Sequence, residues 1–322
     1  MQSTQLSAKR MTLKKFLDQY SIMLITVLMI VIATILQGTT FLSLSNFINI
    51  IRNNSVVGII AFGMSLVIIS GNIDLSVGAQ MVLVASLTLD VVNRSGSALL
   101  GVITAFAFSC TLSLITGLIV TKGRVPSFIV TLGLQYIYRS ILIYTLNGGG
   151  ITTQNKSYAL ISSYNLFGWL PLQIVYFFVM AAIFFFISKY TVLGRHIYAV
   201  GSNEKATRLS GIKTDRIKIY AFLLLGAAIA VAAVAESSRM GSINSTSSGT
   251  GYELNAIAMS VIGGVAMEGG KGKLTNTMFG AFIFGLINNI LTLVGVNTRL
   301  VNAFKGAIII IAVLLQRKSR ER

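Results

Sequence analysis

Apolar stretches, each long enough to cross a lipid bilayer as one helix, follow one another along almost the whole chain. A spanning helix needs about 20 mostly apolar residues. Of the 322 residues, 54% are hydrophobic and 11% are charged, whereas soluble domains carry about 25% charged residues. The pattern predicts an all-α polytopic membrane protein with about ten transmembrane helices, at residues 20–37, 55–70, 79–92, 98–121, 125–146, 171–188, 217–238, 252–267, 274–296 and 300–315.

The basic residues orient these predicted helices. The net charge is +17, but the basic residues lie between apolar stretches and not along one soluble face, so we expect no nucleic-acid partner. Ten helices put both termini on the same side as the main basic clusters, and basic clusters mark the cytoplasmic side. The helices at 79–92 and 252–267 are short, and either could be re-entrant. The predicted regions are a cytoplasmic N-terminal segment at 1–19, a transmembrane domain at 20–316 with a cytoplasmic loop at 189–218, and a basic cytoplasmic tail at 317–322.

A faint internal repeat relates the two halves. Residues 71–76 align with residues 250–255, so that Asp74 meets Glu253. Because the offset spans five predicted helices, the two halves would have opposite orientations. Transporters built from inverted repeats place the solute path at the interface of the repeats. We therefore expect two inverted repeats, with the N- and C-termini both cytoplasmic.

Two carboxylates lie at the edges of apolar sequence, beside glycines. Asp74 follows the predicted helix at 55–70, and Glu253 begins the apolar segment at 252–267. A charge inside the bilayer is costly, so such residues face a polar cavity or a partner group. Asp74 and Glu253 could line or gate a solute path, with Asn72 beside them, or they could cap the helices that they precede. The two roles are compatible.

Two further polar residues lie in the middle of a predicted helix. Asn288 and Asn289 interrupt the apolar run at 274–296. Amides in hydrocarbon seek hydrogen-bond partners, so both should face the protein interior. They could join two helices or contact the solute, and the sequence favours the first role.

The loop at 189–218 is expected to contain a short helix at 202–211. Ser202 or Asn203 could cap its start, and Gly211 suits the left-handed residue after its end. Its apolar side chains would lie on one side, within a polar rim, and could dock on a cytoplasmic partner; the alternative is a solvated amphipathic turn. The candidate docking residues are Ser202, Asn203, Glu204, Ala206, Arg208, Leu209 and Gly211.

The sequence shows no catalytic or metal-binding pattern. His196 is the only histidine, so neither a metal cluster nor a Ser-His-Asp set can be assembled. Residues 264–271 resemble a phosphate-binding loop, but the glycine–lysine spacing is wrong and Glu268 would repel phosphate. We expect no enzymatic activity, no cofactor and no metal site in this chain.

Several motifs, taken together, resemble one family. The chain is similar to the ribose-type ABC transporter permeases, which include importers of monosaccharides and of autoinducer-2 and are the inner-membrane components of binding-protein-dependent systems. Asn72 departs from the usual glycine, and Met267-Glu268 departs from a Leu-Ser-like pair, so the solute subtype is in doubt. The matching segments are GNIDLSVG at 71–78, KGRVPSFIVTLG at 122–133, LGRHIYAVGSNE at 193–204, RLSGI at 208–212, GTGYELNAIA at 249–258 and VIGG at 261–264.

The resemblance implies a multi-pass permease in the inner (plasma) membrane, surrounded by lipid. It also implies three partners: a cytoplasmic ATP-binding subunit that holds ATP and Mg, an extracytoplasmic solute-binding protein, and a second permease copy or a paralogue. The segment at 202–211 matches the loop expected to dock on the ATP-binding subunit. The rival interpretation is an ion-coupled secondary transporter, with Asp74, Glu236 and Glu253 as coupling carboxylates.

Two acid–base pairs have the spacing of ion pairs within one helix. Glu236 precedes Arg239 by three residues, and Asp90 precedes Arg94 by four. Residues at these spacings lie on the same helix face. We therefore expect each carboxylate to pair with its arginine, which leaves Glu236 less suited to a proton relay.

Overall fold

The computed structural model describes residues 23–24, 26–35, 38–297, 300–301, 303–307 and 310. The predicted segments at 1–19 and 317–322, and parts of the predicted helices at 20–37 and 300–315, lie outside the described residues. After a short apolar helix at Thr26–Ile35, the elements are η1 (Gly38–Thr40), α2 (Leu44–Ile69), α3 (Val77–Ser95), α4 (Ala98–Lys122), α5 (Ser127–Thr145), β1 (Gly150–Thr152), α6 (Lys156–Ser163), β2 (Asn165–Leu166), β3 (Leu170–Pro171), α7 (Leu172–Tyr190), α8 (Val192–Ser202), α9 (Glu204–Leu209), α10 (Thr214–Met240), β4 (Ser242–Asn244), α11 (Tyr252–Ile262) and α12 (Leu274–Leu293).

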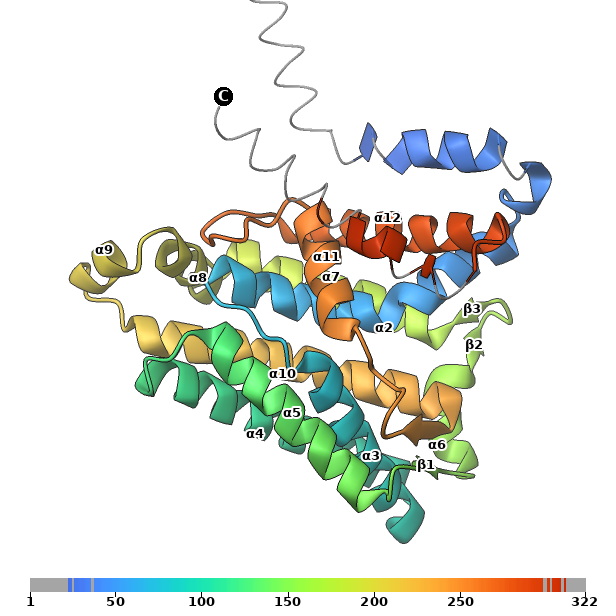
Figure 1. The fold of residues 1–322 in the computed structure, drawn as a ribbon, viewed down its shortest axis with the longest axis horizontal. Helices are drawn as coiled ribbons and strands as arrows, with labels where there is room; N and C mark the ends of the chain where they lie inside the picture. The colour runs from blue at the N-terminus through green and yellow to red at the C-terminus, as the bar shows by residue number, and fades with distance from the viewer. Residues whose placement is uncertain are drawn as a thin grey trace, which may run out of the picture.

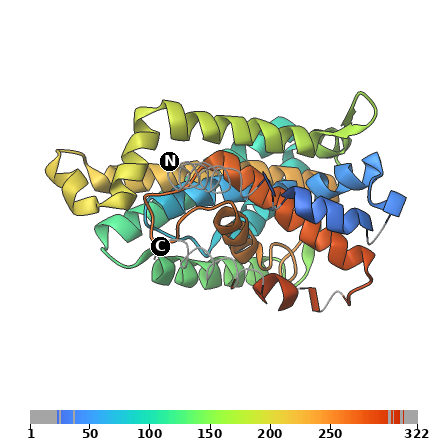
Figure 2. The same ribbon diagram turned by 90° about the horizontal axis from the view of Figure 1, so that it is seen from above.

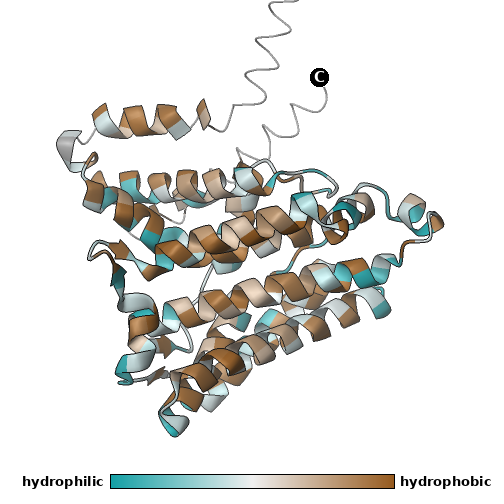
Figure 3. Cartoon of the chain, turned by 180° about the vertical axis from the view of Figure 1, so that it is seen from behind, coloured by the Kyte–Doolittle hydropathy of each residue, from teal (hydrophilic) through white to brown (hydrophobic). Residues whose placement is uncertain are grey.

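The long helices form one elongated bundle. Helices α2, α7, α10 and α12 run roughly along its length, and α10 packs against α2, α3 and α4 (Figures 1 and 2). Helices α8 and α9 lie at one end of the bundle, and α6 with the short strands lies at the other. Apolar residues cover the middle of the bundle, whereas polar residues gather towards its ends (Figure 3).

Six helices in the described residues are long and apolar enough to cross a membrane: α2, α4, α5, α7, α10 and α12. The chain is therefore an all-α polytopic membrane protein. Two of the predicted helices, at 79–92 and 252–267, are not among these six. Helix α11 has 11 residues, or about 16 Å at 1.5 Å per residue, about half of the hydrocarbon core. It ends at Gly263 and Gly264, and Gly264 has a left-handed φ of 82°.

Helix α3 is longer than the sequence predicted, but it is not among the six apolar helices. It runs for 19 residues from Val77 to Ser95, and buried polar side chains such as Gln80 lower its hydropathy. Gln80 donates to Ser113 Oγ of α4 at 2.9 Å. The side-chain amide of Gln80 is therefore accommodated by a protein contact rather than by lipid.

The start of α2 corrects one prediction. The sequence predicts a helix that begins at residue 55, but α2 begins at Leu44, where Ser43 Oγ accepts the N–H of Asn46 at 3.3 Å. Two asparagines of this segment, Asn46 and Asn54, are accommodated within the helix by hydrogen bonds across to α12. Asn289 donates to Asn46 at 2.7 Å, and Asn288 donates to Asn54 at 3.3 Å.

The predicted loop at 147–169 has structure of its own. It contains β1, α6 and most of the β2–β3 hairpin. Strand β1 pairs antiparallel with β4, with Ile151 opposite Ile243, and so joins segments that are distant in sequence. The fully buried Tyr158 of α6 forms a hydrogen bond of 2.6 Å with Ser237 of α10. This end of the bundle is therefore closed by ordered chain.

Both predicted ion pairs within helices are confirmed. Arg239 lies 3.4 Å from Glu236, and Arg94 lies 2.8 Å from Asp90. Glu236 also accepts the hydroxyl of Tyr252 at 3.2 Å. The carboxylate of Glu236 is thus held by two partners within the protein.

Candidate functional site

The loop between α7 and α10 forms two helices at one end of the bundle. Of the two proposed capping residues, Asn203 caps α9, since its Oδ1 accepts the N–H of Ala206 at 3.0 Å. Ser202 is instead the last residue of α8. Gly211 follows α9 with a left-handed φ of 83°, as its position predicts. The segment at 202–211 thus becomes a six-residue helix with a sharp exit.

One face of α9 carries an apolar side chain that no part of the described chain covers. Leu209 is 90% exposed, and Ala206 is exposed on the same helix, three residues earlier. Thr207 is buried on the opposite side, where its hydroxyl donates to the carbonyl of Asn203 at 2.8 Å. The helix therefore leaves Ala206 and Leu209 exposed, and Leu209 also lines the cavity described below.

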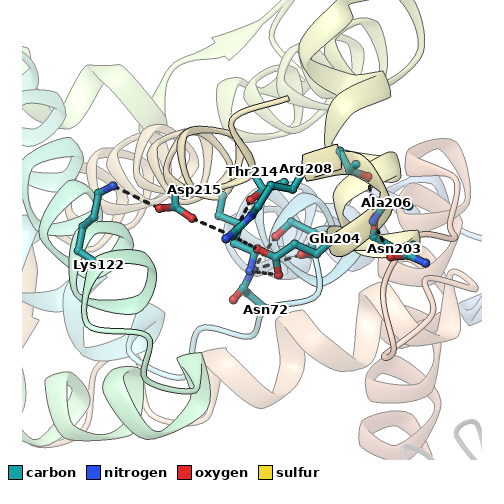
Figure 4. Close-up of polar contacts among 11 residues, drawn as sticks. Asn72, Lys122, Asn203, Glu204, Ala206, Arg208, Thr214 and Asp215 are labelled. Atoms are coloured by element: carbon teal, nitrogen blue, oxygen red, sulfur yellow. Dashed lines mark hydrogen bonds and ion pairs between the residues drawn. The ribbon is translucent and has the colours of Figure 1, made fainter. Parts of the chain in front are cut away.

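A network of ion pairs ties α9 to α4 and α10 (Figure 4). Arg208 lies 3.1 Å from Glu204 and 3.5 Å from Asp215. Lys218 lies 2.7 Å from Glu204, and Lys122 lies 3.2 Å from Asp215. Glu204 and Arg208, which the sequence placed on a polar rim, thus point back to the bundle. This network fixes the orientation of α9.

The network also controls the ionisation of Glu204. Partial burial of its carboxyl would raise the pKa, but the hydrogen bond and charge of Lys218, with smaller contributions from Thr214 and Arg208, lower it. Glu204 is therefore held as a carboxylate. Lys122, Asp215 and Lys218 were missed as site residues, although Lys122 directly follows one predicted helix and Lys218 lies at the start of another.

A cavity of about 1000 Å³ opens between α9, the start of α10, the α4–α5 turn and the segment after α2. Asn72, a predicted path residue, lines this cavity. Arg124 and Lys205 also line it and have no ion-pair partner among the described residues. The cavity brings the predicted docking helix and the GNIDLSVG segment to one place.

Four glycines let three backbone segments meet beside this cavity; we call Gly71, Gly201, Gly269 and Gly270 the glycine junction. The N–H of Gly270 donates to the carbonyl of Ile69 at 2.8 Å. A Cβ at Gly201 would collide with that carbonyl and would lie 2.6 Å from the Gly270 nitrogen. The end of α2, the end of α8 and the loop before α12 are therefore in direct backbone contact, which only glycine permits.

Asp74 lies in the extended segment between α2 and α3 and is fully buried. Its Oδ1 accepts the N–H of Ser76 at 2.8 Å and the hydroxyl of Ser76 at 2.6 Å, whereas Oδ2 has no partner among the described residues. Helix α5 holds the same segment, since Ser127 and Thr131 accept the N–H groups of Ile73 and Leu75, each at 3.0 Å. Asp74 thus organises the start of α3.

Glu253 lies in the first turn of α11, between α3 and α5. Its Oε1 accepts a hydrogen bond of 3.4 Å from Gln135, and a Cβ at Gly78 would lie 2.5 Å from its Oε2. One turn further along α5, Arg139 donates to the carbonyls of Ser245 and Ser248 at 2.8 and 3.0 Å. Gln135 and Arg139 were missed as site residues, although polar residues inside the apolar stretch at 125–146 are a signal for them.

The predicted path residues thus fall into two groups. Asn72 and Asp74 lie on the segment between α2 and α3, and Glu253 lies where α11 meets α3. Asn288 and Asn289 instead face α2, where they bond to Asn54 and Asn46. The latter contacts have the form expected of polar groups that join two membrane helices.

Comparison with known proteins gives the family. Residues 46–313 match the family described as branched-chain amino acid transport system / permease component. The ribose import permease protein RbsC of Escherichia coli (strain K12) is 37% identical over 99% of this chain and 100% of its own length. RbsC of Bacillus subtilis (strain 168) is 35% identical over 90% of each chain, and the L-arabinose transport system permease protein AraH of E. coli (strain K12) is 30% identical over 93% of this chain and 90% of its own. No solved structure matches.

The fold and these matches define a multi-pass inner-membrane permease. The chain belongs to this permease-component family, which matches most of its length. It is therefore the translocating component of an ABC transporter and not the ATPase.

Proposed function

We propose that this chain is the membrane-spanning subunit of an ATP-driven importer for a monosaccharide, most specifically a pentose. The observation that carries the proposal is the match to the ribose import permease over nearly the whole of both chains. Related proteins named for xylose and L-arabinose transport are 30% identical to this chain. Ribose, xylose and arabinose are all five-carbon sugars, so a pentose is the solute class these relatives share.

The energy for transport would come from a partner. A cytoplasmic ATP-binding subunit, holding ATP and Mg, would dock on α9, and an extracytoplasmic binding protein would deliver the sugar. The exposed Leu209 and Ala206 support this docking site, because interface anchors are apolar groups with a polar surround. A second permease copy or a paralogue would complete the pathway.

Alternating access would move the sugar through about ten helices arranged as two inverted repeats. In this proposal Asn72, Asp74 and Glu253 line or gate the path, and Asn288 and Asn289 hold α12 against α2. The glycine junction supports the coupling, since it joins the end of α8, next to α9, to the end of α2. A shift of α9 on ATP binding would then reach the segment that carries Asn72 and Asp74.

The rival ion-coupled transporter is less well supported. It would use Asp74, Glu236 and Glu253 as coupling carboxylates, and of these Glu236 pairs with Arg239 and accepts a hydrogen bond from Tyr252. A carboxylate with two internal partners is poorly placed to exchange an ion with each transport cycle.

Uptake of labelled sugars tests the solute class. Cells that express this chain with its ATP-binding subunit and binding protein, in a host without its own pentose permeases, should accumulate labelled ribose. Unlabelled pentoses should compete better than branched-chain amino acids, because the side chains of those amino acids have none of the hydroxyl groups of a sugar. Competition by leucine but not by any pentose would contradict the proposal. The matched control is the same strain with this chain deleted.

Accessible cysteines test the ten-helix topology. In a background lacking Cys110, a cysteine at Lys205 should react with an impermeant thiol reagent only after the membrane is opened. A cysteine at Ser247 should react in intact cells, because it lies at the opposite end of the bundle from α9. Both positions are exposed, whereas Ser245 is fully buried. Labelling of position 205 in intact cells would rule out the cytoplasmic loop.

A further inference from the structure

The β2–β3 hairpin presents aromatic side chains at the end of the bundle opposite α9 (Figure 1). Leu166 pairs with Leu170, and the turn between them contains Phe167, Gly168 and Trp169. Phe167 is 82% exposed and Trp169 is 53% exposed. Phe167 also has a left-handed φ of 55°, a conformation that costs free energy in any residue with a side chain. The tight turn accounts for this conformation, since the N–H of Trp169 donates to the carbonyl of Leu166 at 3.3 Å. The turn leaves the ring of Phe167 uncovered by the described chain.

The hairpin leads directly into α7, which lies at the edge of the bundle (Figure 2). One face of α7 is exposed and apolar, with Phe178, Ile183 and Phe186 among its residues. Side chains at such helical spacing form one continuous stripe. An apolar stripe on a helix of this membrane protein faces lipid acyl chains, so the hairpin lies at the end of a lipid-facing surface.

The length of α7 places the hairpin relative to the bilayer. The helix has 19 residues, or about 28 Å at 1.5 Å per residue, close to the hydrocarbon thickness of about 30 Å. At its other end Lys189 lies 5.2 Å from the ring centroids of Phe185 and Tyr190. Aromatic and basic residues of this kind mark the interface between lipid and water. When this end lies at one interface, the hairpin reaches the other.

We propose that the β2–β3 hairpin is a lipid anchor, with Phe167 and Trp169 inserted in the headgroup region of the leaflet opposite α9. The partner is the phospholipid surface itself. The indole of Trp169 is an amphipathic ring of the kind that favours this region, and the Phe167 ring beside it adds apolar surface. The anchor would fix the outer end of α7. It would also fix α6, because the Tyr176 hydroxyl of α7 donates a hydrogen bond to the Ile161 carbonyl of α6. A soluble protein that covers the hairpin is the other possible occupant.

Trp169 is the only tryptophan in the chain, so the native protein reports on this site without any substitution. The full chain is reconstituted in phosphatidylcholine vesicles that carry bromine either near the carbonyl end or near the terminal end of the acyl chain. We expect a blue-shifted emission and a greater loss of emission with the shallow bromine than with the deep one. Iodide, present on both sides of the membrane, should quench little.

Two variants calibrate the depth. W169F/L209W moves the tryptophan to α9 and should be quenched by iodide and not by brominated lipid. W169F/F178W moves it to the lipid face of α7 and should shift the greater loss to the deeper bromine. Strong iodide quenching of native Trp169 without any effect of brominated lipid would overturn the proposal. That result would leave the hairpin in water, open to a soluble partner.

Discussion

Replacing Leu209 with Asp is expected to reduce recovery of the ATP-binding subunit with the permease by tenfold or more. Leu209 is 90% exposed on α9, and in the proposed complex it enters a groove of the partner. An unpaired carboxylate in an apolar groove costs several kcal/mol, and about 1.4 kcal/mol corresponds to a tenfold change in affinity. Membrane insertion should be unchanged, because no apolar span is altered. The measurement is the amount of ATP-binding subunit that copurifies with the tagged permease.

The matched control for this variant is Val192→Asp. Val192 is also an exposed apolar residue of the same loop, at the start of α8, but it lies outside the α9 face. This control should retain the ATP-binding subunit and sugar-stimulated hydrolysis. If Leu209→Asp retained both as well, the docking surface would lie elsewhere, and the loop that carries Lys271 and Lys273 would be the next candidate.

Replacing Gly201 with Ala is expected to abolish transport and to lower the melting temperature of the permease. The added methyl group collides with the carbonyl of Ile69 and lies 2.6 Å from the nitrogen of Gly270. Overpacking typically costs about 1–3 kcal/mol. Because the neighbours here are backbone atoms, they can yield only if the glycine junction opens. Opening would uncouple the end of α8, and α9 after it, from the segment that carries Asp74.

The control for crowding is Gly133→Ala. A Cβ at Gly133, on the exposed side of α5, meets no atom within 4 Å, so uptake and melting temperature should stay at wild-type values. The Gly201→Ala variant should still recover the ATP-binding subunit, since Ala206 and Leu209 are untouched. Wild-type uptake by Gly201→Ala would show that tight contact at the glycine junction is not needed for coupling.

The sequence predicts the apolar helices well because their signals are local. The stretch at 98–121 becomes α4, Ala98–Lys122, and the stretch at 217–238 becomes α10, Thr214–Met240. Each is a long apolar run bounded by polar residues. The start of α2 was missed because its asparagines read as a loop, whereas partners on α12, more than 230 residues away, make them part of a helix.

The site was predicted only in part, for the same reason. The cap at Asn203 and the left-handed Gly211 follow from local turn chemistry. The ion pair of Lys122 with Asp215 and the bond of Gln135 to Glu253 join residues that are distant in sequence. The glycine junction needs three separate segments to meet, which no single stretch of sequence reveals. The roles of Asn72, Asp74 and Glu253 in a solute path stay predictions.

Sugar uptake into proteoliposomes tests most directly whether this chain is an ATP-driven permease. The chain is reconstituted with its ATP-binding subunit, with sugar-loaded binding protein on one side of the membrane and ATP supplied on the other. We predict uptake of labelled ribose that requires ATP and the ATP-binding subunit and that persists when ionophores collapse the proton and sodium gradients. Ribose uptake by the chain alone, driven by an ion gradient and lost on adding the ionophores, would contradict the assignment as an ATP-driven permease.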